Sequence, residues 1–144
     1  MNVENAIEPD SQTAALEFLK KLAPDESFVM VNLLKFKENA EYKEGSKYKE
    51  EKAISGAEAY QKYLDEVIGF VQKSGKDVQV LSDSKVFGLL LGKVEELWDR
   101  VVLVRYGSVK VFQELTQSKP FLDAQEHRLA GLAGQLNIGT KASS

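Results

Sequence analysis

The chain has 144 residues, with 19 basic and 22 acidic side chains that leave a net charge of −3 at pH 7. This length suits a single domain, and the interspersed charges argue against a nucleic-acid-binding surface or a membrane-binding one. With no Cys and one His, dedicated zinc and iron–sulfur sites are not expected, so we predict no metal and no cofactor. Without a basic-plus-apolar leader, we expect a cytoplasmic protein.

The first part of the chain predicts a tail, a short helix and then a strand. Asp10 or Ser11 can cap the helix, and Pro24 stops it. The strand over 27–36 contains "VMVNLLKFK", a nearly unbroken apolar run that lacks the alternation of a strand with one wet face. Asn32, in the middle of this run, is the one residue that an apolar strand does not explain.

A charged segment separates this strand from the clearest helix in the sequence. Residues 37–54 favour a solvated loop, while Tyr42 and Tyr48 leave open a second interpretation as a lid over a pocket. The helix begins after Ser55, and Glu58 three residues later completes a capping box. Its apolar residues recur at the spacing of an amphipathic helix.

The second half of the chain predicts two further strands, two helices and a closing strand. Ser108 and Ser118 are expected N-caps for the two helices, and Ser82–Ser84 predicts a bulge or bend. The segments are an extended strand over 76–92, a turn at 93–98, a strand over 99–107, helices from 108 and 118, and a strand over 134–140.

The element order is a helix followed by β-α-β-β-α-α-β, which reduces to the ferredoxin-like βαββαβ plan. We therefore predict an α+β fold with an antiparallel four-stranded sheet and an extra N-terminal helix. Residues 1–26 would form the tail and short helix, and residues 27–141 the ferredoxin-like domain.

The two strands expected at the centre of this sheet are apolar on both faces. Helices cover only one face in this plan, and each 100 Å² of apolar surface left in water would forgo about 2.5 kcal/mol. A second copy of the same face is the simplest cover, which predicts a homodimer that forms an α/β barrel. The alternative is that the N-terminal helix covers this face.

Four segments occur in an order similar to that of an uncharacterised family in the dimeric α/β-barrel superfamily. They are "VMVNLLKFK", "SGAEAYQKY", "LWDRVVLVRY" followed by Ser108, and "HRLAGL". The resemblance spans about residues 28–138 and implies a ferredoxin-like fold and a homodimer. This superfamily includes cofactor-free monooxygenases, lactone isomerases and haem-degrading enzymes. In the haem-degrading enzymes an Asn, a Trp and a His stand in an order loosely similar to that of Asn32, Trp98 and His127.

Two residues are candidates for catalysis. An amide in an apolar strand costs about 1–3 kcal/mol unless it is hydrogen-bonded, so Asn32 either bonds nearby backbone or points into a cleft to orient a carbonyl or enol. His127, the only His, could act as a general base near neutral pH or could simply cap a carbonyl at a helix junction.

Aromatic and basic residues supply further candidates for ligand binding. Core packing or an ion pair is the competing interpretation for each of them. The candidates are Tyr60, Tyr63, Trp98, Arg105, Tyr106 and Arg128.

Two hypotheses about function remain open from the sequence. One is a cofactor-independent oxygenase or isomerase that uses Asn32 and His127 on an aromatic or enolisable compound. The other is a non-catalytic dimeric module that binds a small hydrophobic or aromatic ligand, or a protein partner. A cavity lined by both Asn32 and His127 would favour the enzyme.

Overall fold

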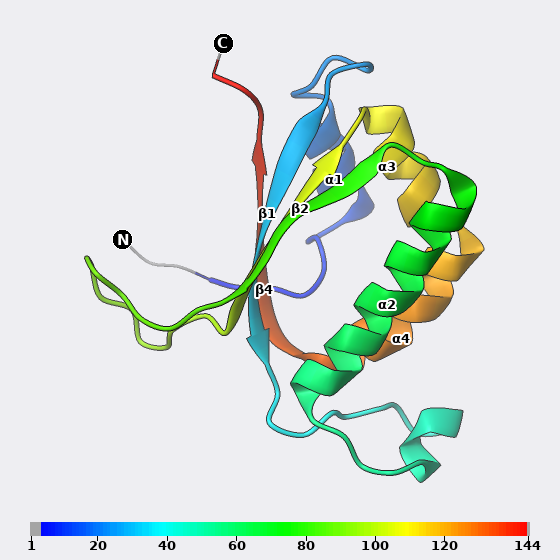
Figure 1. The fold of residues 1–144 in the computed structure, drawn as a ribbon, viewed down its shortest axis with the longest axis vertical. Helices are drawn as coiled ribbons and strands as arrows, with labels where there is room; N and C mark the ends of the chain where they lie inside the picture. Colours follow the sequence, from blue (N-terminus) through cyan, green and yellow to red (C-terminus); the bar gives the residue numbers. More distant parts are fainter. Residues whose placement is uncertain (1–3, 144) are drawn as a thin grey trace.

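The computed structural model describes residues 4–143 and consists of one antiparallel sheet with helices on one of its faces (Figure 1). Within these residues, each helix is too short or too polar to cross a bilayer. The elements are α1 (Gln12–Leu19), β1 (Phe28–Phe36), a short 3₁₀ helix η1 (Lys47–Glu50), α2 (Gly56–Ser74), β2 (Val78–Lys85), β3 (Arg100–Tyr106), α3 (Val109–Thr116), α4 (Lys119–Gly131) and β4 (Leu132–Thr140).

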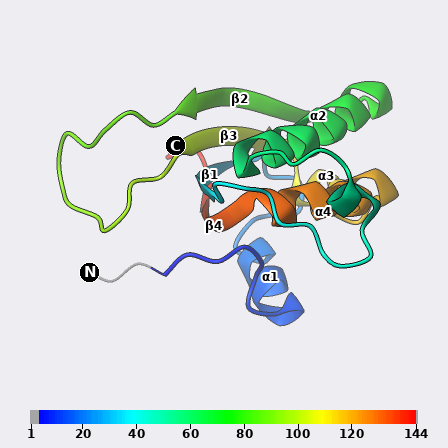
Figure 2. The same ribbon diagram turned by 90° about the horizontal axis from the view of Figure 1, so that it is seen from below.

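The sheet has the strand order β2-β3-β1-β4, and all three neighbouring pairs are antiparallel. The helices α2, α3 and α4 cover one face, as Figure 2 shows most clearly. This is the ferredoxin-like βαββαβ arrangement, and it confirms the predicted fold class and the central position of β1 and β3. The predicted capping box is also present, because Ser55 Oγ accepts from the Glu58 amide at 3.0 Å and Glu58 Oε1 accepts from the Ser55 amide at 3.1 Å.

The prediction of an extended strand over 76–92 was wrong in its second half. The bend also lies earlier than predicted, as a register shift between Val80 and Ser82. The strand β2 ends at Lys85, and the hairpin closes where the Val86 amide donates to the Asp99 carbonyl at 3.0 Å. Beyond Val86, no neighbouring strand pairs with the rest of "VFGLLLG", so this apolar run forms a loop. We call residues 86–98 the β2–β3 arm; it projects from the helix-free side of the sheet (Figure 1).

The two faces of the central strands differ in burial. The helix-facing side chains of Phe28, Met30, Leu34 and Val102 are buried in the core. On the opposite face the apolar side chains are only partly buried. These are Val29, Val31, Leu33, Val101 and Leu103.

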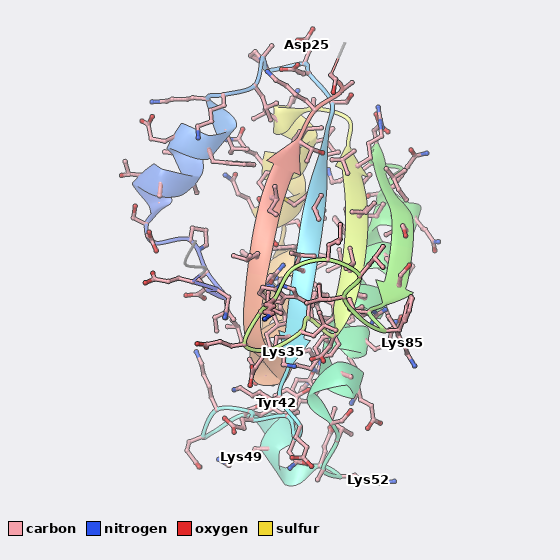
Figure 3. The ribbon with its side chains drawn as sticks, turned by 90° about the vertical axis from the view of Figure 1, so that its left-hand side faces the viewer. Asp25, Lys35, Tyr42, Lys49, Lys52 and Lys85 are labelled. Atoms are coloured by element: carbon pink, nitrogen blue, oxygen red, sulfur yellow. The ribbon has the colours of Figure 1, made fainter. Side chains whose placement is uncertain are left out.

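The helix α1 does not cover the helix-free face. It lies beyond the β4 edge of the sheet (Figures 2 and 3), and Gly139 of β4 lies against the ring of Phe18. The helix-free face of the sheet is therefore left without a helix, and the β2–β3 arm passes in front of only one end of the strands (Figure 3). The alternative in which α1 shields this face was wrong.

The end of β1, the start of α2 and the end of α4 come together below the sheet, where their backbones are in contact. The Gly56 amide donates to the Lys37 carbonyl at 3.1 Å, and the Lys37 amide donates to the Gly131 carbonyl at 2.8 Å. A Cβ on Gly56 would overlap the Lys37 carbonyl and lie 2.6 Å from the Gly131 carbonyl. Glycine is required at Gly56 because only backbone without a side chain fits this junction.

We expect Gly56→Ala to lower the free energy of unfolding by about 1–3 kcal/mol, because the new methyl group forces the junction apart. Gly69→Ala is the matched control within α2, since its Cβ would meet no atom within 4 Å. That variant should stabilise by about 0.5–1 kcal/mol through helix propensity. Urea denaturation of both variants measures the difference, and equal stabilities would contradict the close-contact assignment.

Candidate functional site

The main candidate site is a cleft of 540 Å³ between the helix-facing side of the sheet and the helices. The segment before α1 and the first turns of α1 close its outer side, next to β4. A second cavity of 310 Å³ extends from it beneath α2 towards β2. The two spaces share a set of lining residues, which places that set at the centre of the site: Asn32, Tyr60, Tyr63, Tyr106 and Phe121.

Five aromatic rings form one part of the cleft wall: Tyr60, Tyr63, Tyr106, Phe112 and Phe121. Tyr60 and Tyr63 come from successive turns of α2, with ring centroids 5.2 Å apart, and Tyr63 meets Phe121 of α4 edge-on at 6.2 Å. Tyr106, at the end of β3, packs edge-on against Phe112 of α3 at 4.9 Å. Tyr106 also stacks on Phe28, with centroids 5.3 Å apart, so these rings make a firmly packed apolar wall.

The three phenols of this wall are proton donors at neutral pH. Burial raises the pKa of Tyr60, of Tyr63 and of Tyr106 above the ordinary value of tyrosine. A raised phenol pKa keeps the hydroxyl protonated, because loss of the proton would leave a charge in an apolar surrounding. These side chains can donate a hydrogen bond to a ligand oxygen, but they cannot act as general bases near neutral pH.

A polar network runs along the cleft floor, and Asn32 lies at its centre. Its Nδ2 donates to the Val102 carbonyl at 3.0 Å, and its Oδ1 accepts from Gln135 Nε2 at 3.0 Å. Gln135 Oε1 in turn accepts from Arg128 Nη2 at 2.6 Å, and Gln135 Nε2 also contacts Asn137 Oδ1. Asn32 thus has backbone and side-chain partners and also lines the cleft, and its role in orienting a carbonyl or enol stays a prediction.

His127 lies in a different place and does not line this cleft. It is 2 % exposed, and its Nδ1 is 2.7 Å from the Tyr42 hydroxyl while its Nε2 is 3.5 Å from Glu66 Oε1. The Tyr48 ring packs on the imidazole with centroids 4.4 Å apart. We call His127, Tyr42 and Tyr48 the histidine clamp, because they fasten the 37–54 segment to α4.

The structure therefore does not bring the two predicted catalytic residues together. Asn32 faces the cleft, whereas His127 holds a loop at the lower end of the molecule, where Figure 3 labels Tyr42. Within the clamp, burial and the nearby Glu126 carboxylate raise the pKa of Tyr42 to about 12. The phenol stays protonated and is hydrogen-bonded to Nδ1, while Nε2 faces Glu66.

Two other candidates also lie outside the cleft. Arg105 points to the helix-free face and pairs with Asp77, with 2.9 Å between Nη1 and Oδ1. Its assignment to ligand binding is therefore corrected to an ion pair within the chain. Trp98 is half-buried at the end of the β2–β3 arm and lines none of these cavities.

Sequence reasoning missed several residues of the site, among them Phe112, Phe121, Gln135 and Asn137. The signal for the last two is visible in "GQLNIGT", where the two amides occupy alternate positions and so share one face of β4. Among the described residues, no group of three or more His, Cys, Asp or Glu side chains could hold a metal ion.

Tyr42→Phe should lower the free energy of unfolding by about 1 kcal/mol, because His127 Nδ1 loses its hydrogen-bond partner in a buried setting. Tyr48→Phe keeps the packed ring and is the matched control, with little change expected. Urea denaturation at neutral pH measures both, and limited proteolysis of the 37–54 segment reports local loosening. Equal behaviour of the two variants would show that the phenol–imidazole bond does not hold the clamp.

Comparison with known proteins shows the fold. No protein-family model matches the chain, and no curated protein matches it. Two structures of the protein RPA0582, one in methylated form and one, of unknown function, from Rhodopseudomonas palustris, align with TM-scores of 0.81 and 0.80 at 23% identity. They cover 97% and 98% of this chain, and 96% and 99% of the RPA0582 chains.

A candidate antibiotic biosynthesis monooxygenase from Caulobacter crescentus aligns with a TM-score of 0.59 at 14% identity, over 87% of this chain and 97% of its own. A dimeric protein of unknown function from Bacteroides fragilis aligns at 0.51 with 7% identity, over 81% and 96% of the two chains. The Bacteroides protein is itself described as having a ferredoxin-like fold. These likenesses place the chain among proteins of ferredoxin-like fold.

Proposed function

We propose that this protein binds a small aromatic or enolisable molecule in the 540 Å³ cleft. One observation carries the proposal: three protonated phenols and a guanidinium–amide network line a single space, together with apolar side chains. Ligand pockets typically combine apolar walls with a few such convergent polar groups. The cleft is large enough for a bicyclic ligand, and its hydroxyl donors can hold a carbonyl or enol oxygen.

Catalysis is the second candidate function, and it has narrower support. Donors aimed at an oxygen can stabilise an enolate, and a cofactor-independent oxygenase or isomerase needs such stabilisation. Proton removal also needs a base, however, and Glu8 is the one carboxylate among the residues that line the cleft. Since His127 lies elsewhere, binding is the better-supported activity, and the fold shared with a candidate monooxygenase adds only analogy.

We also propose that two copies associate through the helix-free face. This face carries partly buried Val31, Leu33 and Leu103 on the two central strands, and the β2–β3 arm adds Phe87 and Leu90 at 101% and 95% exposure. A two-fold axis would bring each arm over the partner's sheet and bury both sets of side chains at once. The dimeric Bacteroides protein shares the fold and is consistent with such an assembly.

A thermal-shift screen with flat aromatic compounds should reveal ligands that raise the melting temperature, since binding to the folded state alone stabilises it. Ala15→Trp should abolish the shift by filling the cleft from α1, where Ala15 lines the wall. Thr13→Trp places the same ring on an exposed position of the same helix and should leave the shift intact. Identical responses of the two variants would remove the cleft as the binding site.

Phe87→Ser combined with Leu90→Ser should convert a dimer into a monomer in sedimentation velocity experiments at micromolar concentration. Both side chains are fully or almost fully exposed in the single chain, so the change costs the monomer little stability. Leu103→Lys tests the sheet itself, and Gln117→Lys on α3 adds the same charge elsewhere as a control. If the wild-type protein sediments as a monomer, the proposed association is wrong. The helix-free face would then be a surface for a different protein.

A further inference from the structure

The cleft contains a guanidinium whose partners differ from those of the other arginines. Arg100 and Arg105 each pair with an aspartate carboxylate, Asp83 and Asp77 respectively. Arg128 is held instead by three neutral oxygens: Gln125 Oε1 at 3.3 Å from Nη1, and the Ile7 carbonyl at 2.7 Å and Gln135 Oε1 at 2.6 Å from Nη2. These bonds fix the orientation of the guanidinium and leave its charge without an anionic partner.

Neutral acceptors position an arginine, but they do not neutralise it. A partly buried cation is stabilised by a carboxylate far more than by an amide oxygen. The bonds to Ile7 and Gln135 occupy Nη2, so Nε and Nη1 are the nitrogens with donors left for a ligand. Among the residues that line the cleft, the one carboxylate belongs to Glu8. Arg128 also lines an adjoining pocket of 370 Å³ together with Glu4, Glu8 and Asp10, and among the described residues these exposed carboxylates form no ion pair with it. The charge balance of the site is completed most simply by its ligand.

From this arrangement we propose that the ligand carries an anionic group, a carboxylate or an enolate, which binds Arg128. The inference rests on the proposed ligand-binding function and names the chemical class of the ligand. Its flat apolar body lies among Tyr60, Tyr63 and Phe112, and its anion points towards β4. The network behind the arginine, through Gln135 to Asn32, prevents the guanidinium from turning away.

The test uses two probes of the same size, 2-naphthoate and 2-naphthamide, which differ in charge and not in shape. We expect the wild-type chain to bind the naphthoate 10-fold to 100-fold more tightly by isothermal titration calorimetry, the range typical of a charge-assisted hydrogen-bonded pair. Arg128→Gln should abolish this preference, so that the ratio of the two affinities falls to about one.

Control variants separate a local contact from a general effect of charge. Lys119→Gln removes one positive charge from the exposed surface of the same helix and should keep the preference. Glu8→Gln removes the one acid of the lining and should strengthen naphthoate binding without changing naphthamide binding. Arg128→Lys keeps the charge but loses the planar fork, and it should retain part of the preference.

The outcomes distinguish this inference from the function on which it rests. If neither probe binds the wild-type chain, nor any other compound in the aromatic screen, the proposed ligand-binding function fails. If both probes bind equally, or if Arg128→Gln weakens both to the same degree while its circular dichroism and melting temperature are unchanged, the cleft binds ligands and the anionic class is wrong.

Discussion

The architecture depends on one constraint: the central strands β1 and β3 are apolar on both faces, while the chain supplies helices for only one. On the covered face, the side chains of Phe28, Leu34 and Val102 are sealed into a core. The opposite face has no such layer within the described residues. Both proposed functional features follow from this asymmetry. The helix layer encloses the cleft, and the helix-free face leaves an apolar surface that favours association.

The cleft exists because the helix layer is supported unevenly. At its lower end, Gly56 and Gly131 allow the backbones of α2 and α4 to touch, and the layer is closed there. Away from this end the aromatic side chains of Tyr60, Tyr63 and Phe112 line the interior. The segment before α1 and the first turn of α1 close the cleft on its outer side.

The fold was predictable because local signals agreed with the overall plan. The capping box at Ser55 and the two-sided apolar strands each specify structure over short distances, and they implied the element order without long-range information. The arm was not predictable in the same way. An apolar run such as "VFGLLLG" satisfies every local rule for a strand. Only the position of the neighbouring strand β3, which begins at Arg100, shows that the run beyond Val86 has no strand to pair with.

The candidate site was only partly predictable, since a site is a long-range arrangement. Residue chemistry identified Asn32, Tyr60 and Arg128 correctly as members of one cleft. It also selected His127, because the only histidine of a chain is an obvious candidate for a general base. Nothing local indicates that Tyr42, 85 positions earlier, occupies its ring nitrogen. The partner of a polar side chain decides whether it is free for chemistry, and that partner is usually remote in sequence.

The segment before α1 has a consequence for how binding would be measured. Its Ala6 amide donates to the Gln135 carbonyl, and its Ile7 carbonyl accepts from Arg128, so this strap is attached to the same two residues that orient the cleft. Ligand affinity and strap ordering are then thermodynamically linked. Removing this strap would take one hydrogen-bond acceptor from the arginine, and the proposed ligand affinity would then change although the sheet and helices were unaltered.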